Sequence, residues 1–227
     1  METPFREHNR PAVAVDSWLE IVRREAEKLH RESKGSHDWD HTLRVYRLCL
    51  RIGRVEGADM NVVRPAAYLH DIGRGAQDQS GGKVCHAREG AVLAKKLADL
   101  LPLTQAQKEN IVHCVRTHRF RGNQIPLTLE AKVLFDADKL DSIGAVGVAR
   151  AFLFAGEIGA MLHNPNNEIE NTRPYSEDDT GYREFKLKLC RIKDRVITEE
   201  GKRLAKERHE FMEFFFKRFL DEIEGKR

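Results

Sequence analysis

"AAYLHDIGRG", residues 66–75, places a histidine and an aspartate directly after an apolar stretch and close to two glycines. Residues 61–73 have the apolar spacing of a short helix, which we expect to end near Gly73. Pro65 is expected in the first turn, where a missing N–H costs little. His70 and Asp71 should then lie at the C-terminal end of this helix. They are either an ordinary buried polar pair or part of a metal site.

The same helical periodicity extends in both directions from this stretch. Residues 74–83 read as a loop by composition, and 163–181 as a polar excursion. No run of alternating β-branched residues is long enough to predict a strand. The sequence therefore predicts an all-α, single-domain helical bundle over residues 1–227. The further helices are expected at 15–30, 41–59 (capped by Asp38), 85–101, 104–118, 128–160 (with a break at Gly144 as an option), after Tyr182, and at 199–223.

The composition excludes several classes of protein. With 41% hydrophobic and 33% charged residues, the chain is typical of a soluble globular protein. A net charge of +3 is too small for a surface that coats nucleic acid, so a nucleic-acid partner is not expected. No apolar run predicts a membrane span, and the N-terminus lacks the pattern of a secretory signal. The four cysteines contain no CxxC pair, which fits reduced thiols and a cytoplasmic location.

The histidines and aspartates point to a metal site. We expect His8, His30 and His209 on the surface, because charged residues surround them. His41 lies in the first turn of its helix, and His70-Asp71 ends another. An ionised carboxylate on a buried helix is costly unless a cation meets it. Histidines and carboxylates from three helices would suit one divalent ion, which could be Mn, Mg, Fe, Co, Ni or Zn.

"LFDADKLDSIG" offers three aspartates for such a site, at 136, 138 and 141. Steps of 100° per residue place Asp141 at the edge of the apolar stripe and make it the most buried of the three. Asp136 and Asp138 diverge to opposite flanks. Helical geometry alone does not choose between these two.

Four stretches occur in this order along the chain: "SHDWDHTLRVYRLCLRIGRVEGAD", "AAYLHDIGRG", "TLEAKVLFDADKLDSIGAVGVARAF" and "KERHEFMEFF". Together these motifs resemble the HD-domain metal-dependent phosphohydrolases. Their order and their spread over most of the chain match a bacterial branch that includes nucleotide pyrophosphohydrolases. The resemblance implies a metal site of His41, His70, Asp71 and Asp138, with Asp141 orienting a ligand from behind. It also implies hydrolysis of a nucleotide or another small phosphate compound, in which a divalent ion activates water.

Cations near these ligands would stabilise the negative charge that develops on phosphate. Lys139 and Arg44 are candidates for both catalysis and substrate binding, and Asp71 is a candidate catalytic residue besides being a ligand. Arg74, just after the doublet, is a further candidate for substrate binding. No stretch near the motifs offers an aromatic platform for a base, and Tyr68 is expected in the core. We therefore expect triphosphates to be preferred over monophosphates, with loose discrimination among bases.

Three further histidines, His86, His113 and His118, bear on whether there is a second metal ion. Because His113 and His118 are about 140° apart around a helix, both should not face one cavity. We favour His118, near the pocket and in contact with substrate, and we expect one ion. The alternative function is a catalytically idle HD fold that binds a nucleotide or regulates a partner. The sequence does not set the oligomeric state, and a homodimer is an option.

Overall fold

The computed structural model describes residues 17–30, 39–119, 124–164 and 169–227, and within these ranges all regular structure is helical. This confirms the predicted all-α class. The α-helices are α1 (Ser17–His30), α2 (Trp39–Glu56), α3 (Met60–Leu69), α4 (Arg74–Gln79), α5 (His86–Ala98), α6 (Gln105–Thr117), α7 (Leu129–Asp141), α8 (Gly144–Glu157), α9 (Gly181–Leu187) and α10 (Glu199–Ile223). Three short 3-10 turns are η1 (Ile169–Asn171), η2 (Leu189–Arg191) and η3 (Lys193–Arg195).

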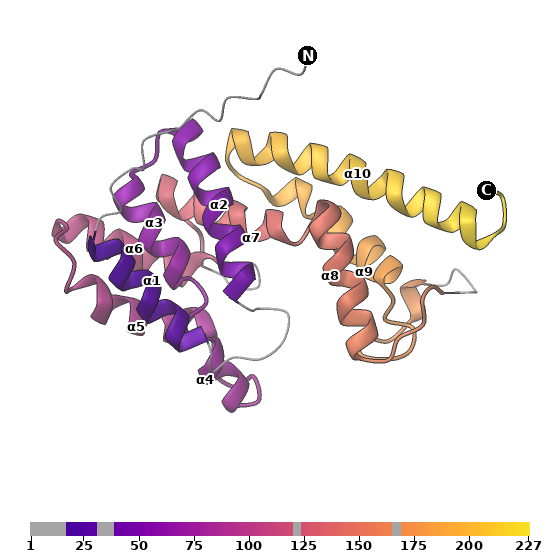
Figure 1. Cartoon of the computed structure of the whole chain (residues 1–227), viewed down its shortest axis with the longest axis horizontal. Helices are drawn as coiled ribbons and strands as arrows, with labels where there is room; N and C mark the ends of the chain where they lie inside the picture. The colour runs from indigo at the N-terminus through magenta and orange to yellow at the C-terminus, as the bar shows by residue number, and fades with distance from the viewer. Residues whose placement is uncertain (1–16, 31–38, 120–123, 165–168) are drawn as a thin grey trace, which may run out of the picture.

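The helices form two groups that α7 and α10 connect (Figure 1). Helices α1–α6 make the larger group, and α8 and α9 lie opposite it. The central helix α7 packs on α2, α3 and α6 on one side and on α8 and α10 on the other. Its Leu134, Ala137 and Leu140 are completely buried. Because α7 runs through the core, the aspartates that it carries lie inside the molecule.

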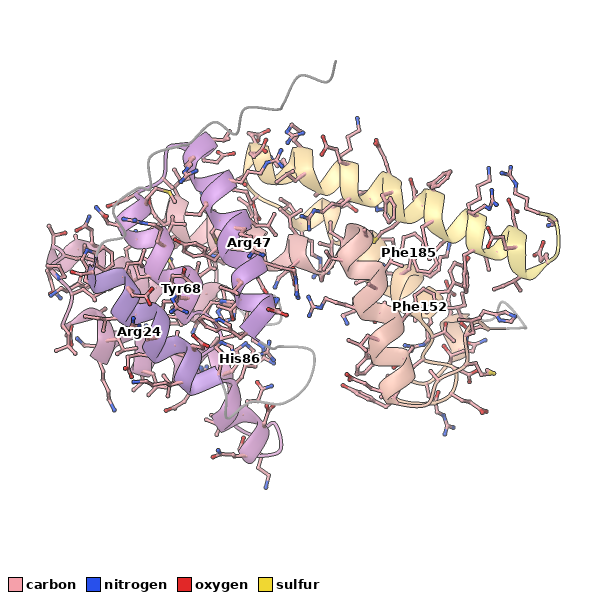
Figure 2. The ribbon with its side chains drawn as sticks, viewed as in Figure 1. Arg24, Arg47, Tyr68, His86, Phe152 and Phe185 are labelled. Atoms are coloured by element: carbon pink, nitrogen blue, oxygen red, sulfur yellow. The ribbon has the colours of Figure 1, made fainter. Side chains whose placement is uncertain are left out.

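The smaller group has an aromatic core of its own. Phe152 of α8 and Phe185 of α9 both lie in this group (Figure 2). The Phe185 ring stacks on Phe216 of α10 with 4.5 Å between centroids. Phe152 also stacks on Phe216, at 6.1 Å. Burial of these rings holds α8 and α9 against α10.

The break at Gly144 follows from its backbone conformation. Its φ of 77° lies in the left-handed region that glycine adopts without penalty. A Cβ at Gly144 would also lie 2.9 Å from a side-chain carbon of Arg208. Helix α7 ends at Asp141 and α8 begins at Gly144, so the predicted tract 128–160 is two helices. The chain changes direction here and brings α8 back over the end of α7.

Two local predictions are wrong. Residues 74–83 are not all loop, because α4 forms from Arg74 to Gln79. Pro65 is not in the first turn: α3 begins at Met60, after the Asp59 cap, so Pro65 lies in its interior. At that position its missing N–H removes one hydrogen bond from the helix. The predicted cap Asp38 lies outside the described residues.

Two histidines expected on the surface are buried. His30 is 5% exposed, and its Nε2 lies 3.2 Å from Thr42 Oγ1. His209 is also 5% exposed, with its Nε2 3.2 Å from Glu213 Oε1. Both belong to helices rich in charge, but each occupies the face that packs on neighbouring helices. His8 lies outside the described residues.

Candidate metal centre

The HD doublet lies in the turn between α3 and α4, where two backbones approach closely. A Cβ at Gly73 would lie 2.2 Å from the carbonyl oxygen of His86 and 2.6 Å from the nitrogen of Gly90. Only glycine allows this approach without a shift of backbone. The contact brings Asp71 against the first turn of α5. The contact thereby places His86 next to Asp71, a position that the composition of residues 74–83 does not predict.

The structure separates the three aspartates of α7. The buried Asp136 accepts hydrogen bonds from the backbone N–H groups of Ile197 and Thr198 and from the Thr198 hydroxyl, so it anchors the chain before α10. Asp138 has its Oδ1 3.5 Å from His41 Nε2. Asp141 contacts the other side of the same ring, with Oδ2 2.8 Å from His41 Nδ1. Asp136 is 0% exposed and Asp141 1%, so Asp141 is not the most buried of the three.

Four buried histidines have Nδ1 at hydrogen-bond distance from an oxygen. His41 donates to Asp141, His70 to the Ala67 carbonyl at 2.8 Å, and His118 to the Val115 carbonyl at 2.6 Å. His86 Nδ1 lies 2.8 Å from Gln77 Oε1. Since these oxygens are acceptors, we assign the proton of each neutral ring to Nδ1. The Nε2 atoms are then available as metal ligands, which is the usual arrangement around a protein-bound metal.

The Nε2 atoms converge with two carboxylates. His41 Nε2 and His70 Nε2 are 3.3 Å apart, and Asp71 Oδ2 lies 3.7 Å from each of them. On its other side, Asp71 Oδ1 lies 3.4 Å from His86 Nε2 and 3.3 Å from His118 Nε2. Two sets of atoms therefore lie close enough together to share a cation. They are His41, His70 and Asp138, and Asp71, His86 and His118.

The donor chemistry fits a divalent cation. Two imidazole Nε2 atoms 3.3 Å apart repel each other unless a proton or a metal ion lies between them. His118 Nε2 is buried and makes no hydrogen bond within the part of the chain that the structure describes. Such an orphaned buried nitrogen is costly in a protein and is explained by a ligand. HD domains bind divalent metals, and these nitrogen and carboxylate donors match borderline first-row ions.

The pKa values show how strongly the cluster attracts positive charge. Burial works against the charged form of His41, but hydrogen bonds to Asp138 and Asp141 outweigh burial and raise its pKa to about 9. Burial lowers the pKa of His70 to about 3 and that of His86 to about 2. Burial alone would raise the pKa of Asp138, but the Lys139 charge and the His41 hydrogen bond hold it well below its usual range. Without a metal ion, His41 is thus the imidazole that holds a proton, while His70 and His86 are neutral and Asp138 is ionised.

The predicted cations occupy different positions. Lys139 is buried, with Nζ 2.6 Å from Asp138 Oδ2. Arg74 Nε lies 3.1 Å from Asp71 Oδ2. Arg44 binds Asp141 through Nε at 2.7 Å and Nη2 at 3.2 Å, so it supports the carboxylate behind His41. Of these three, Lys139 and Arg74 line the pocket next to the cluster.

That pocket has a volume of about 730 Å³, within the range of small-molecule sites, and lies between the two groups of helices. Three further arginines that the sequence did not single out line it, namely Arg119, Arg150 and Arg183. Arg150 of α8 donates to Asp141 Oδ2 at 2.7 Å, and Arg119 follows α6. Arg119 lies outside the motifs, whereas Arg150 lies near the end of the third motif and reaches the site because the chain turns at Gly144. His113 lies apart from the cluster and accepts a hydrogen bond from the Leu127 N–H at 3.1 Å.

The model of the HD domain family matches residues 38–143. The protein YpgQ of Bacillus subtilis (strain 168) is 33% identical over 223 residues, which cover 95% of both chains. The chain belongs to the HD-domain family. The described part of this HD protein contains no helix with the length and apolarity needed to cross a membrane.

Solved structures of similar proteins extend the likeness to the whole fold. An HD-superfamily hydrolase from Bacillus thuringiensis has a TM-score of 0.68 at 26% identity, covering 91% of this chain and 96% of its own. Bacillus subtilis YpgQ in complex with ADP has a TM-score of 0.66 at 30% identity, covering 90% of this chain and 94% of its own. The fold of this HD protein is therefore that of the HD-superfamily hydrolases.

Proposed function

We propose that this chain is a metal-dependent phosphohydrolase that acts on nucleotides, and more narrowly that it releases pyrophosphate from nucleoside triphosphates. The observation that carries the proposal is the convergence of imidazole Nε2 atoms and carboxylates at one end of a pocket that also contains Lys139, Arg74, Arg119 and Arg150. The ADP complex of YpgQ supports a nucleotide as the ligand. The pyrophosphohydrolase step rests on the family resemblance.

In this proposal His41, His70, Asp71 and Asp138 would hold one divalent ion. When bound, the ion would activate water and polarise a phosphoryl oxygen. Asp141 would keep the His41 ring oriented through the 2.8 Å contact with Nδ1. Asp71 would hold the ion and, through its second oxygen, face His86 and His118. His118 would then contact the substrate at the edge of the metal centre.

The cations in the pocket would bind the phosphate chain. Lys139 lies next to a predicted ligand in sequence and in space, and Arg74 contacts another. Arg150 joins α8 to Asp141, so phosphate binding there would bring both groups of helices to the substrate. Charge would be stabilised by groups already in place, which is the most effective form of electrostatic catalysis.

The test is a hydrolysis screen of nucleoside tri-, di- and monophosphates with each candidate metal, in which phosphate and pyrophosphate are measured separately. Asp71→Ala should abolish both metal retention and turnover while the helical circular-dichroism signal is kept. Asp99→Ala, which removes an exposed carboxylate paired with Lys95, is the matched control and should behave as wild type. Full metal content and turnover in Asp71→Ala would refute the site. Nucleotide binding without any product would favour the idle, regulatory alternative.

A further inference from the structure

The end of the pocket away from the metal centre carries a feature that the proposed chemistry does not use. Tyr175 is 78% exposed and, within the described ranges, is the one non-glycine residue with a positive φ, at 57°. A bulky side chain in this region is an outlier that persists only when its surroundings impose it. Tyr175 is one of the residues that line the pocket.

A buried network holds Tyr175 in this conformation. Its backbone N–H donates to Asp179 Oδ2 at 2.8 Å. Asp179 Oδ1 accepts from Arg183 Nη1 at 2.6 Å, and Arg183 also donates to the hydroxyl and the carbonyl oxygen of Thr172. Asp179 and Arg183 are each less than a tenth exposed. The network therefore fixes the backbone that carries the Tyr175 ring.

The Tyr175 ring meets Phe154 of α8. Their centroids are 5.9 Å apart and their planes are inclined by 78°. Phe154 shares one face of α8 with Gly147 and Ala151, and all three line the pocket. Seven residues along a helix rise about 10 Å, so Phe154 lies two turns beyond Gly147 and one turn beyond Arg150. The pocket thus runs from metal ligands and cations to two aromatic rings.

We propose that Phe154 and Tyr175 bind the base of the nucleotide by stacking, while its phosphates lie at the metal and cation end. This deepens the proposed function and rests on it. A nucleotide is charged at one end and carries a flat, uncharged ring at the other, which matches the two ends of this pocket. Stacking on an aromatic ring accepts any base, because every base has a π face. The pair would therefore select nucleotides over simple phosphate chains.

The test compares Tyr175→Asn with Tyr175→Phe. Asparagine tolerates a positive φ, so the first variant removes the ring and keeps the backbone, whereas the second keeps the ring. Phe214→Ala, which removes an exposed aromatic ring outside the pocket, is the control. We expect Tyr175→Asn to raise KM for a nucleoside triphosphate about tenfold or more. Tyr175→Phe and Phe214→Ala should remain within twofold of wild type.

Inorganic triphosphate, used as a substrate or a competitive inhibitor, isolates the contribution of the base. Tyr175→Asn should leave its KM or Ki unchanged. An equal loss on both compounds, or no loss on either, would overturn the inference. If the metal-loaded wild type hydrolyses no nucleotide, the proposed function fails, and equilibrium binding of ADP then decides. Weaker ADP binding by Tyr175→Asn supports the aromatic subsite, and equal affinity, or no ADP binding by wild type, overturns it.

Discussion

Lys139 is the residue whose charge lies closest to the predicted metal ligands, since its Nζ is 2.6 Å from Asp138 Oδ2. We expect Lys139→Ala to lower kcat/KM for nucleoside triphosphates by roughly ten- to a hundredfold, because a charge-assisted contact contributes about 1.5–3 kcal/mol. Metal content should stay nearly unchanged. Steady-state kinetics on tri- and monophosphates and elemental analysis check this. An unaffected variant, or equal rates on monophosphates, would contradict phosphate binding by Lys139.

His118 decides how many ions the cluster holds. The sequence predicts one ion, but Asp71, His86 and His118 form a second set of donors beside the first. We expect one ion per chain and no change in that number for His118→Ala, with the loss confined to substrate affinity. Elemental analysis of both proteins after metal loading measures this. A fall from two ions to one would show that His118 and His86 are ligands of a second ion.

At the scale of elements, Glu200 joins the start of α10 to α2. It accepts hydrogen bonds from Arg51 Nε at 2.9 Å and Arg203 Nε at 2.7 Å. These hydrogen bonds, chiefly the one from Arg203, lower the pKa of Glu200 from 4.5 to about 2. A lowered carboxyl pKa stabilises the fold above pH 4.5, and this contribution is lost as the pH falls from 4.5 toward 2. Glu200→Gln should reduce the free energy of unfolding by roughly 0.5–1 kcal/mol at pH 7.

Urea unfolding of wild type and Glu200→Gln at pH 7, 4 and 3 measures this contribution. The difference between the two proteins should shrink at each step toward acid. Glu199→Gln is the control, since Glu199 is exposed and pairs with Lys202 on its own helix. A difference that persists unchanged at pH 3 would mean that the ion pairs of Glu200 do not stabilise the α2–α10 contact.

At the scale of the whole molecule, we propose that the chain unfolds as one domain, because α7 and α10 pack on both groups of helices. A metal that binds only the folded state at a hundred times its Kd adds about 2.7 kcal/mol. For a chain of this size, removal of the metal should lower Tm by roughly 5–10 °C. Scanning calorimetry with and without a chelator should show one transition that shifts. Asp71→Ala should not respond to the chelator, and two separate transitions would contradict a single domain.

The helical class, the break at Gly144 and the family of this chain could be predicted from sequence, because helical periodicity and the HD motifs are local patterns. Helix faces were harder to assign. His30 and His209 lie among charged residues but face neighbouring helices, and periodicity within one helix does not report what packs against it. The start of α3, and with it the place of Pro65, depended on the Asp59 cap.

The pocket was decided by tertiary structure. The choice of Asp138 over Asp136 as neighbour of His41 depends on where α2 and the chain before α10 pack on α7. Tyr175 is far from the motifs in sequence, and both Tyr175 and Arg150, near the end of the third motif, reach the pocket because α8 folds back after Gly144. Local sequence thus determined the helices and most of the candidate metal ligands. The aromatic end and the second set of donors required packing between segments distant in the chain, because neither follows from the period of any single helix.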